Sequence, residues 1–75
     1  MTYLGDILTG ATCRLVDLGG EAGFRRRLLE LGLVPGTSLR VVRRVPVGGL
    51  LELEVRRCRL TLRTSEAALV QVEPT

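Results

Sequence analysis

The stretch Leu28–Val42, LLELGLVPGTSLRVV, contains a helix end, a tight turn and the start of a strand within fifteen residues. Gly32 stands where a helix that ends in a Schellman motif needs a residue with positive φ, and Leu33 is then placed to contact Leu28. Pro35-Gly36 has the composition of the two central residues of a type II turn. The stretch therefore predicts a short helix that stops at Gly32 and a chain reversal that leads directly into a strand.

Alternation of apolar and polar residues recurs along the rest of the chain. It predicts five short strands, at residues 11–18, 38–45, 50–55, 58–63 and 69–73. One amphipathic helix of about three turns is expected from Glu21, with Phe24, Leu28 and Leu31 on its apolar face. Strands this short, joined by tight turns, curl into a small barrel whose open end the helix can plug. The expected fold is mainly β, with the helix inserted after the first strand.

The junction between the strands at 50–55 and 58–63 has an unusual sequence. Arg56-Arg57 occupies a two-residue hairpin turn, where Asn or Gly is preferred because both positions need positive φ. Either the loop is longer than two residues or the turn is strained.

The composition is that of one soluble globular domain covering residues 1–75. Hydrophobic residues make up 45% and charged residues 25% of the chain, which excludes a disordered protein. No apolar run reaches the roughly 18 residues that span a bilayer. The N-terminal MTYLGDILTG lacks the positive charge and the apolar block of a signal peptide. We therefore expect a cytosolic protein.

The basic residues are all arginine, and the formal net charge is +3. They alternate with glutamates along the chain, whereas nucleic-acid binders concentrate their charge and add aromatic side chains for stacking. Tyr3 and Phe24 are the only aromatic residues. We therefore expect no nucleic-acid partner, and a small barrel that binds nucleic acid through the arginines of its strands is the alternative.

The sequence carries no pattern that indicates catalysis. The chain has no histidine, which excludes His-based triads and Cys–His zinc sites. None of its glycine clusters has the spacing of a phosphate-binding loop. Cys13 and Cys58 are far apart in the sequence, and we expect both to be reduced, buried thiols rather than metal ligands. No enzyme activity, no cofactor and no metal site are expected.

The run Arg25-Arg26-Arg27 is the most distinctive exposed feature. Arginines early in a helix, with Glu30 near its end, oppose the helix dipole, so helix stability does not explain the run. Val34 stands at a corner with little core to receive it, and an apolar corner beside arginines resembles a protein interface. We predict a partner-binding surface that consists of Arg25, Arg26, Leu33, Val34 and Pro35. The alternatives are that Val34 folds back onto the barrel while the arginines only solvate it, or that the loop at 43–49 binds the partner.

Three stretches together resemble the FeoA family: RRRLLELGLVPGTSLRVVRRVPVGG at 25–49, LELEVRRCRLTLR at 51–63 and AALVQVE at 67–73. The similarity extends from about Gly10 to Glu73. The resemblance implies an SH3-like barrel and a small cytosolic accessory or regulatory protein of bacterial ferrous iron uptake. The implied partner is the cytosolic, GTP-binding part of the FeoB permease, which would bring the protein to the inner face of the cytoplasmic membrane. A self-associating module, forming a weak homo-oligomer, is a further alternative.

Overall fold

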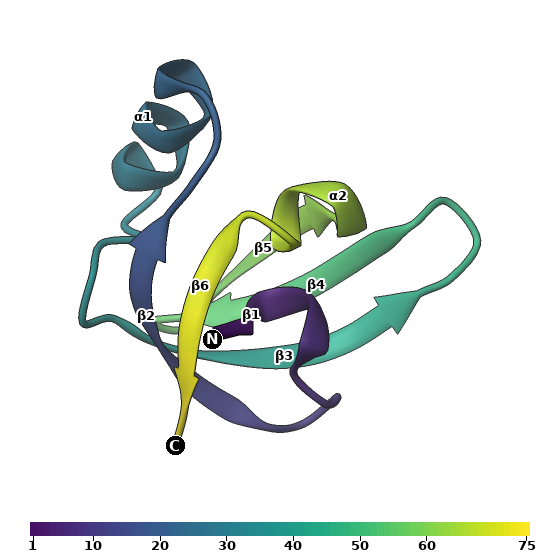
Figure 1. The fold of residues 1–75 in the computed structure, drawn as a ribbon. Coiled ribbons are helices and arrows are strands. Elements are labelled where there is room, and N and C mark those ends of the chain that lie inside the picture. Colours follow the sequence, from purple (N-terminus) through teal and green to yellow (C-terminus); the bar gives the residue numbers. More distant parts are fainter.

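The computed structural model describes residues 1–75 as a strongly curved sheet with two short α-helices and one 3-10 turn (Figure 1). The elements in chain order are β1 (Thr2–Tyr3), η1 (Leu4–Asp6), β2 (Thr12–Leu18), α1 (Ala22–Glu30), β3 (Ser38–Val45), β4 (Leu50–Val55), β5 (Cys58–Arg63), α2 (Thr64–Ala67) and β6 (Val70–Pro74). The strands form one antiparallel sheet in the order β1-β6-β2-β3-β4-β5. With nine and four residues, α1 and α2 are each too short to cross a membrane. The predicted fold class, mainly β with a helix between two strands, is confirmed.

Strands β2 to β6 lie where the alternation predicted them, although β5 is buried fully only at Leu62. β3, β4 and β5 have the predicted bounds, while β2 and β6 each begin one residue later than expected. The inward positions supply a core of sixteen buried apolar side chains. Leu15, Val41, Leu53 and Val72, from four different strands, are each at most 3% exposed. The alternation of apolar and polar residues along these strands therefore correctly indicated the face that is buried.

The N-terminal segment adds a sixth strand that the sequence did not predict. β1 pairs with residues 71–72 of β6, and the following turn places Leu4 and Ile7 in the core. One guanidinium nitrogen of Arg44, Nη2, donates to the carbonyl oxygen of Gly5 at 2.7 Å and also to that of Ile7. A strand of two residues is too short for alternation to reveal it, because what defines it is a partner at the far end of the chain.

The end of α1 has the hydrogen bonds of a Schellman motif, as predicted. The Leu33 N–H donates to the Leu28 carbonyl at 2.9 Å, and the Gly32 N–H donates to the Leu29 carbonyl at 3.0 Å. Gly32 has φ of 93°, which glycine adopts without a steric penalty. Leu28 and Leu33 are both buried in the core. The helix therefore ends where the sequence predicted, and its last turn is fixed to the barrel by the leucine that follows Gly32.

The predicted type II turn at Pro35-Gly36 is also present, and it docks onto β2. The Thr37 N–H donates to the Val34 carbonyl at 3.1 Å, and Gly36 has φ of 93°. The Gly36 N–H donates to the carbonyl of Leu15 at 2.8 Å, and the Leu15 N–H donates to the Thr37 carbonyl at 2.8 Å. The reversal after α1 is therefore held by the backbone of β2 before the chain enters β3.

The helix covers the core with fewer side chains than predicted. Leu28 is fully buried and Phe24 is partly buried against the core, but Leu31 is 49% exposed, so its predicted place in the plug is wrong. The helical hydrogen bonds end near Glu30, and the Schellman closure brings Leu33 rather than Leu31 to the core beside Leu28. In Figure 1, α1 accordingly stands out from one end of the sheet, away from the β3–β4 loop.

The Arg56-Arg57 junction is a tight hairpin turn with both arginines in the left-handed region. Val55 pairs with Cys58, so the loop has only two residues, and φ is 50° at Arg56 and 69° at Arg57. This is the backbone of a type I′ turn, which matches the twist of the flanking strands. For residues with a Cβ atom the left-handed conformation costs roughly 1–2 kcal/mol each. Of the two possibilities that the sequence left open, the turn is the strained one.

Candidate protein interaction surface

The structure distributes the five predicted interface residues between the surface and the core. Arg25 and Arg26 are exposed on α1, and Pro35 is exposed in the turn after it. Val34 is half-buried, so it is neither fully exposed for a partner nor fully folded back onto the barrel. Leu33 is 1% exposed, because the helix closure turns its side chain into the core. Leu33 is therefore not accessible to a partner in this conformation.

One leucine that sequence reasoning did not assign joins the two arginines on the outer side of α1. Leu29 is 45% exposed and lies four residues after Arg25, so the two side chains are neighbours on the helix surface. The signal was present in the sequence, since adjacent helical positions point about 100° apart and Leu28 and Leu29 cannot both face the core. We call Arg25, Arg26, Leu29, Val34 and Pro35 the α1 surface. Its two arginines form no ion pair.

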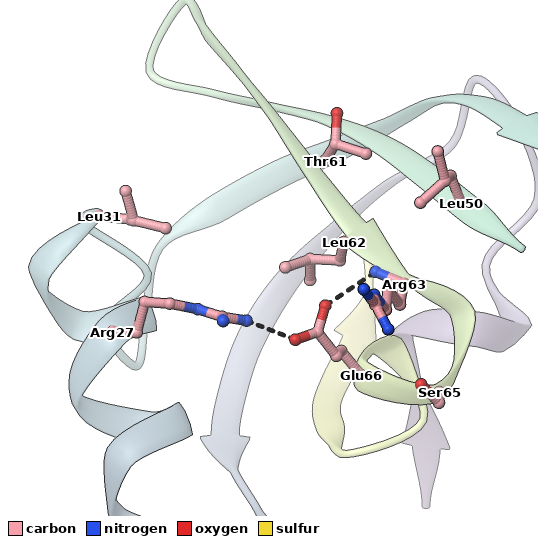
Figure 2. Close-up of a pocket in the computed structure, with 8 residues that line it drawn as sticks. All are labelled: Arg27, Leu31, Leu50, Thr61, Leu62, Arg63, Ser65 and Glu66. Carbon is pink, nitrogen blue, oxygen red and sulfur yellow. Dashed lines mark hydrogen bonds and ion pairs between the residues drawn. The ribbon is translucent and has the colours of Figure 1, made fainter. Parts of the chain in front are cut away.

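A groove lies on the other side of α1, between the helix and the edge of the sheet (Figure 2). Its volume is about 600 Å³. Arg27 of α1 and Leu31 directly after it form one wall, and residues of β4, β5 and α2 form the rest: Leu50, Thr61, Leu62, Arg63, Ser65 and Glu66. Figure 2 shows Leu62 directed from β5 toward α1. The leucine that does not reach the core, Leu31, therefore contributes an apolar side chain to this groove.

An ion pair between Arg27 and Glu66 spans the groove and connects α1 to α2 (Figure 2). The second carboxylate oxygen of Glu66, Oε1, accepts the backbone N–H of Arg63 at 2.9 Å. This backbone hydrogen bond and the Arg27 guanidinium hold the pKa of Glu66 below its ordinary value, because both favour the ionised carboxylate. The Arg27 guanidinium also lies 5.6 Å from the centre of the Phe24 ring, a cation–π distance. Glu66 thus links α1 to the edge of the sheet, in addition to the core contacts of Leu28 and Leu33.

The outer face of the sheet pairs its arginines with glutamates across strands β3, β4 and β5. Arg40 lies 3.2 Å from Glu54, and Glu52 lies between Arg43 at 3.2 Å and Arg59 at 3.0 Å. Each of these cations has a carboxylate beside it, so the strands present alternating charges rather than a continuous basic stripe. Exposed pairs of this kind contribute little to stability. Their arrangement gives no support to the nucleic-acid alternative, which required these arginines to be free for phosphates.

The two cysteines differ in burial, contrary to the sequence prediction. Cys13 is buried in the core, and burial raises the pKa of its thiol. Cys58 is exposed, so the prediction that both thiols are buried is wrong for this residue. It follows the Arg56-Arg57 turn directly on the edge strand β5, where alternation points it inward but no element covers it. No group of three or more Cys, His, Asp or Glu side chains is arranged to hold a metal ion.

Residues 2–74 match the sequence pattern of the FeoA domain family. The chain belongs to the FeoA family. FeoA from Chlorobium tepidum has a TM-score of 0.91 and 33% identity to this chain, over 97% of this chain and 70% of that one. FeoA from Stenotrophomonas maltophilia, a procaryotic SH3 domain protein solved with zinc, has a TM-score of 0.84 and 34% identity, over 97% of this chain and 91% of that one. The predicted family resemblance and the SH3-like fold are confirmed.

A relative of known role joins FeoA to a transporter in one polypeptide. It is the Fe(2+) transport protein A/Fe(2+) transporter FeoB fusion protein of Porphyromonas gingivalis W83. The match is 31% identical over 70 residues, which is 93% of this chain and 8% of that protein. The chain therefore corresponds to a small part of the fusion protein, and the family to which both belong is one of ferrous iron transport.

Proposed function

We propose that this protein is a non-catalytic accessory subunit of ferrous iron uptake that binds the cytosolic, GTP-binding part of a FeoB-type permease. The observation that carries the proposal is that a FeoA component and a FeoB transporter are fused in one polypeptide in the Porphyromonas gingivalis relative. Fusion holds two components at equal stoichiometry and at high effective concentration, which favours components that bind each other. In a separate chain, the same association has to come from a binding surface.

The α1 surface has the composition that such an association requires. It combines the exposed apolar side chains of Leu29 and Pro35 with two arginines that have no partner within the molecule. Protein interfaces commonly place apolar anchors inside a charged rim, and arginine is enriched in them. Docking through α1 would place the protein at the cytosolic face of the membrane, next to the permease.

The experiment is a calorimetric titration of the protein with the cytosolic domain of the FeoB-type permease from the same genome. Leu29→Asp is expected to weaken the affinity by at least about tenfold, because it places a charge among apolar contacts that exclude water. Arg25→Glu combined with Arg26→Glu is expected to slow association, with a smaller effect at high salt. Val47→Asp makes the same change in the alternative surface, because Val47 is 89% exposed in the β3–β4 loop, which lies away from α1 (Figure 1).

The variants distinguish the two candidate surfaces. Loss of binding in Leu29→Asp but not in Val47→Asp supports the α1 surface, and the reverse result would move the interface to the loop at 43–49. No binding by the wild-type protein, in the presence or absence of GTP, would refute the proposed function. Each variant is first compared with the wild type by thermal unfolding, so that loss of folding is not mistaken for loss of contact.

A further inference from the structure

The outer edge of β5 has backbone groups without hydrogen-bond partners, and it faces the groove beside α1. β5 is the last strand of the sheet and pairs only with β4. In an antiparallel pair, the residues of each strand alternate between those bonded to the neighbour and those whose N–H and C=O point away from it. Two structural details show which residues of β5 point away.

The first detail is the two-residue hairpin turn. Because Val55 and Cys58 flank this turn, they form a hydrogen-bonded pair, as do Leu53↔Leu60 and Leu51↔Leu62 after them. The intervening residues, Arg59, Thr61 and Arg63, therefore point their backbone groups away from β4. The second detail is that the Arg63 N–H donates to Glu66 rather than to β4. The Glu66 carboxylate thus occupies, at Arg63, the place that a further strand would take.

The N–H and C=O groups of Arg59 and Thr61 have no such substitute. They lie on the same edge of β5 as the Arg63 N–H, which donates to Glu66, and Thr61 itself lines the groove. Exposed edges with unpaired backbone groups are templates for the addition of another strand. The apolar side chains of Leu31 and Leu62 line the groove next to this edge.

We propose that this edge binds one extended segment of the permease partner as an added strand, in which acidic residues alternate with apolar ones. This inference rests on the proposed function, because it specifies how that partner is held. Side chains on one face of the added strand would contact Leu31 and the groove. Those on the other face would lie beside Arg59, whose guanidinium also contacts Glu52 and Glu54, and beside Arg63, which forms no ion pair within the protein. Carboxylates are the side chains that the unpaired Arg63 guanidinium favours.

A second copy of the chain is a poor occupant of the same edge. Two β5 strands related by a two-fold axis at Thr61 would place Arg59 of each strand opposite Arg63 of the other. Like charges directly opposite each other destabilise a strand pair. In this register the arginines disfavour self-pairing, whereas the unpaired Arg63 favours an acidic strand.

Thr61→Pro tests the proposal with little change to the protein itself. Proline removes the outward N–H of residue 61, a group that no hydrogen bond within the protein uses, and it obstructs an added strand. Thr61→Val is the matched control, because it keeps the N–H and a β-branched side chain of similar size. In titrations with the permease cytosolic domain, we expect Thr61→Pro to weaken the affinity about tenfold or more, and Thr61→Val to change it less than about twofold.

Amide hydrogen exchange gives a second measurement that does not depend on the folding of a variant. In the wild-type protein alone, the amides of Arg59 and Thr61 should exchange quickly, and in the complex both should become protected while exposed amides of the β3–β4 loop do not. If the wild type binds the permease domain but these two amides stay unprotected, or Thr61→Pro binds as tightly as Thr61→Val, the added strand is refuted and the proposed function stands. If the wild type does not bind at all, the proposed function and the added strand are both refuted.

Discussion

Two glycines of the helical region should respond in opposite ways to the same change, alanine substitution. Gly23 lies inside α1, and Gly32 lies just after it at φ of 93°. A Cβ atom built at either position would have no heavy atom within 4 Å. Steric collision is therefore absent at both sites, and the two substitutions differ only in the backbone conformation that the new side chain must adopt.

The expected magnitudes follow from this difference. At Gly32, a residue with a Cβ atom pays roughly 1–2 kcal/mol for the left-handed conformation. The reduced freedom of the unfolded chain returns about 0.4–1 kcal/mol, so Gly32→Ala should lower the free energy of unfolding by about 1 kcal/mol. Gly32→Val should lower it further, because a β-branched residue is poorly tolerated at positive φ. At Gly23, alanine gains helix propensity of up to ~1 kcal/mol, and about half of that is expected in the first turn of the helix.

Urea denaturation followed by far-ultraviolet circular dichroism measures both effects, with the slope of the transition as a check that the unfolded state is unchanged. For a domain of this size, 1 kcal/mol corresponds to a shift of about 4–8 °C in Tm. The two alanine variants should therefore move Tm in opposite directions. If Gly32→Ala is as stable as the wild type, or is stabilised as Gly23→Ala is, the positive φ of Gly32 does not limit stability and the reasoning fails.

Replacing Arg57, at φ of 69°, by glycine should raise the free energy of unfolding by about 0.5–1 kcal/mol. The relief of left-handed strain in the folded turn is larger than the cost of the extra freedom that glycine gives the unfolded chain. Unchanged or lower stability in urea would show that the arginine side chain stabilises the turn. A thiol reagent at neutral pH should label exposed Cys58 in the native protein and Cys13 only after unfolding, and mass spectra with two labels on the folded chain would contradict the burial of Cys13. Folding lowers the pKa of Glu66 from its ordinary value of 4.5. The ionised carboxylate therefore contributes fully to the free energy of unfolding above pH 4.5, and this contribution is lost as pH falls through the folded pKa. Glu66→Gln should therefore be less stable than the wild type at pH 7 and approach it in acid, and a stability difference that stays the same at both pH values would contradict this.

The parts of this fold that sequence predicted well are those in which the cause lies within a few residues. The bounds of β4 and β5 follow from alternation, and the end of α1 follows from Gly32 and Leu33. The exposure of Leu31 was missed because helical periodicity applies only within the helix. It does not show that the Schellman closure places Leu33, rather than Leu31, in the core. Cys58 was misplaced because alternation gives the face of a strand but does not show whether that face is covered.

The groove could not be predicted from any local pattern, because its residues come from three separate regions of the chain. The ion pair that spans it joins residues 39 positions apart. The interface prediction identified the exposed arginines of α1 correctly as surface residues, but it included Leu33, whose burial depends on packing rather than on sequence spacing. The edge of β5 is likewise a property of strand order, which the alternation of a single strand does not contain.

The position of β6 in the sheet has a consequence for synthesis on the ribosome. β6 lies between β1 and β2, and it is the only strand that pairs with β1. While residues 70–74 are still inside the exit tunnel, β1 has no partner, and Leu4 and Ile7 have no completed core to enter. The pairing of β1 with β6 therefore cannot form until residues 70–74 have left the tunnel. Pairings this distant in sequence form slowly, since a long loop must close before they contribute any stability.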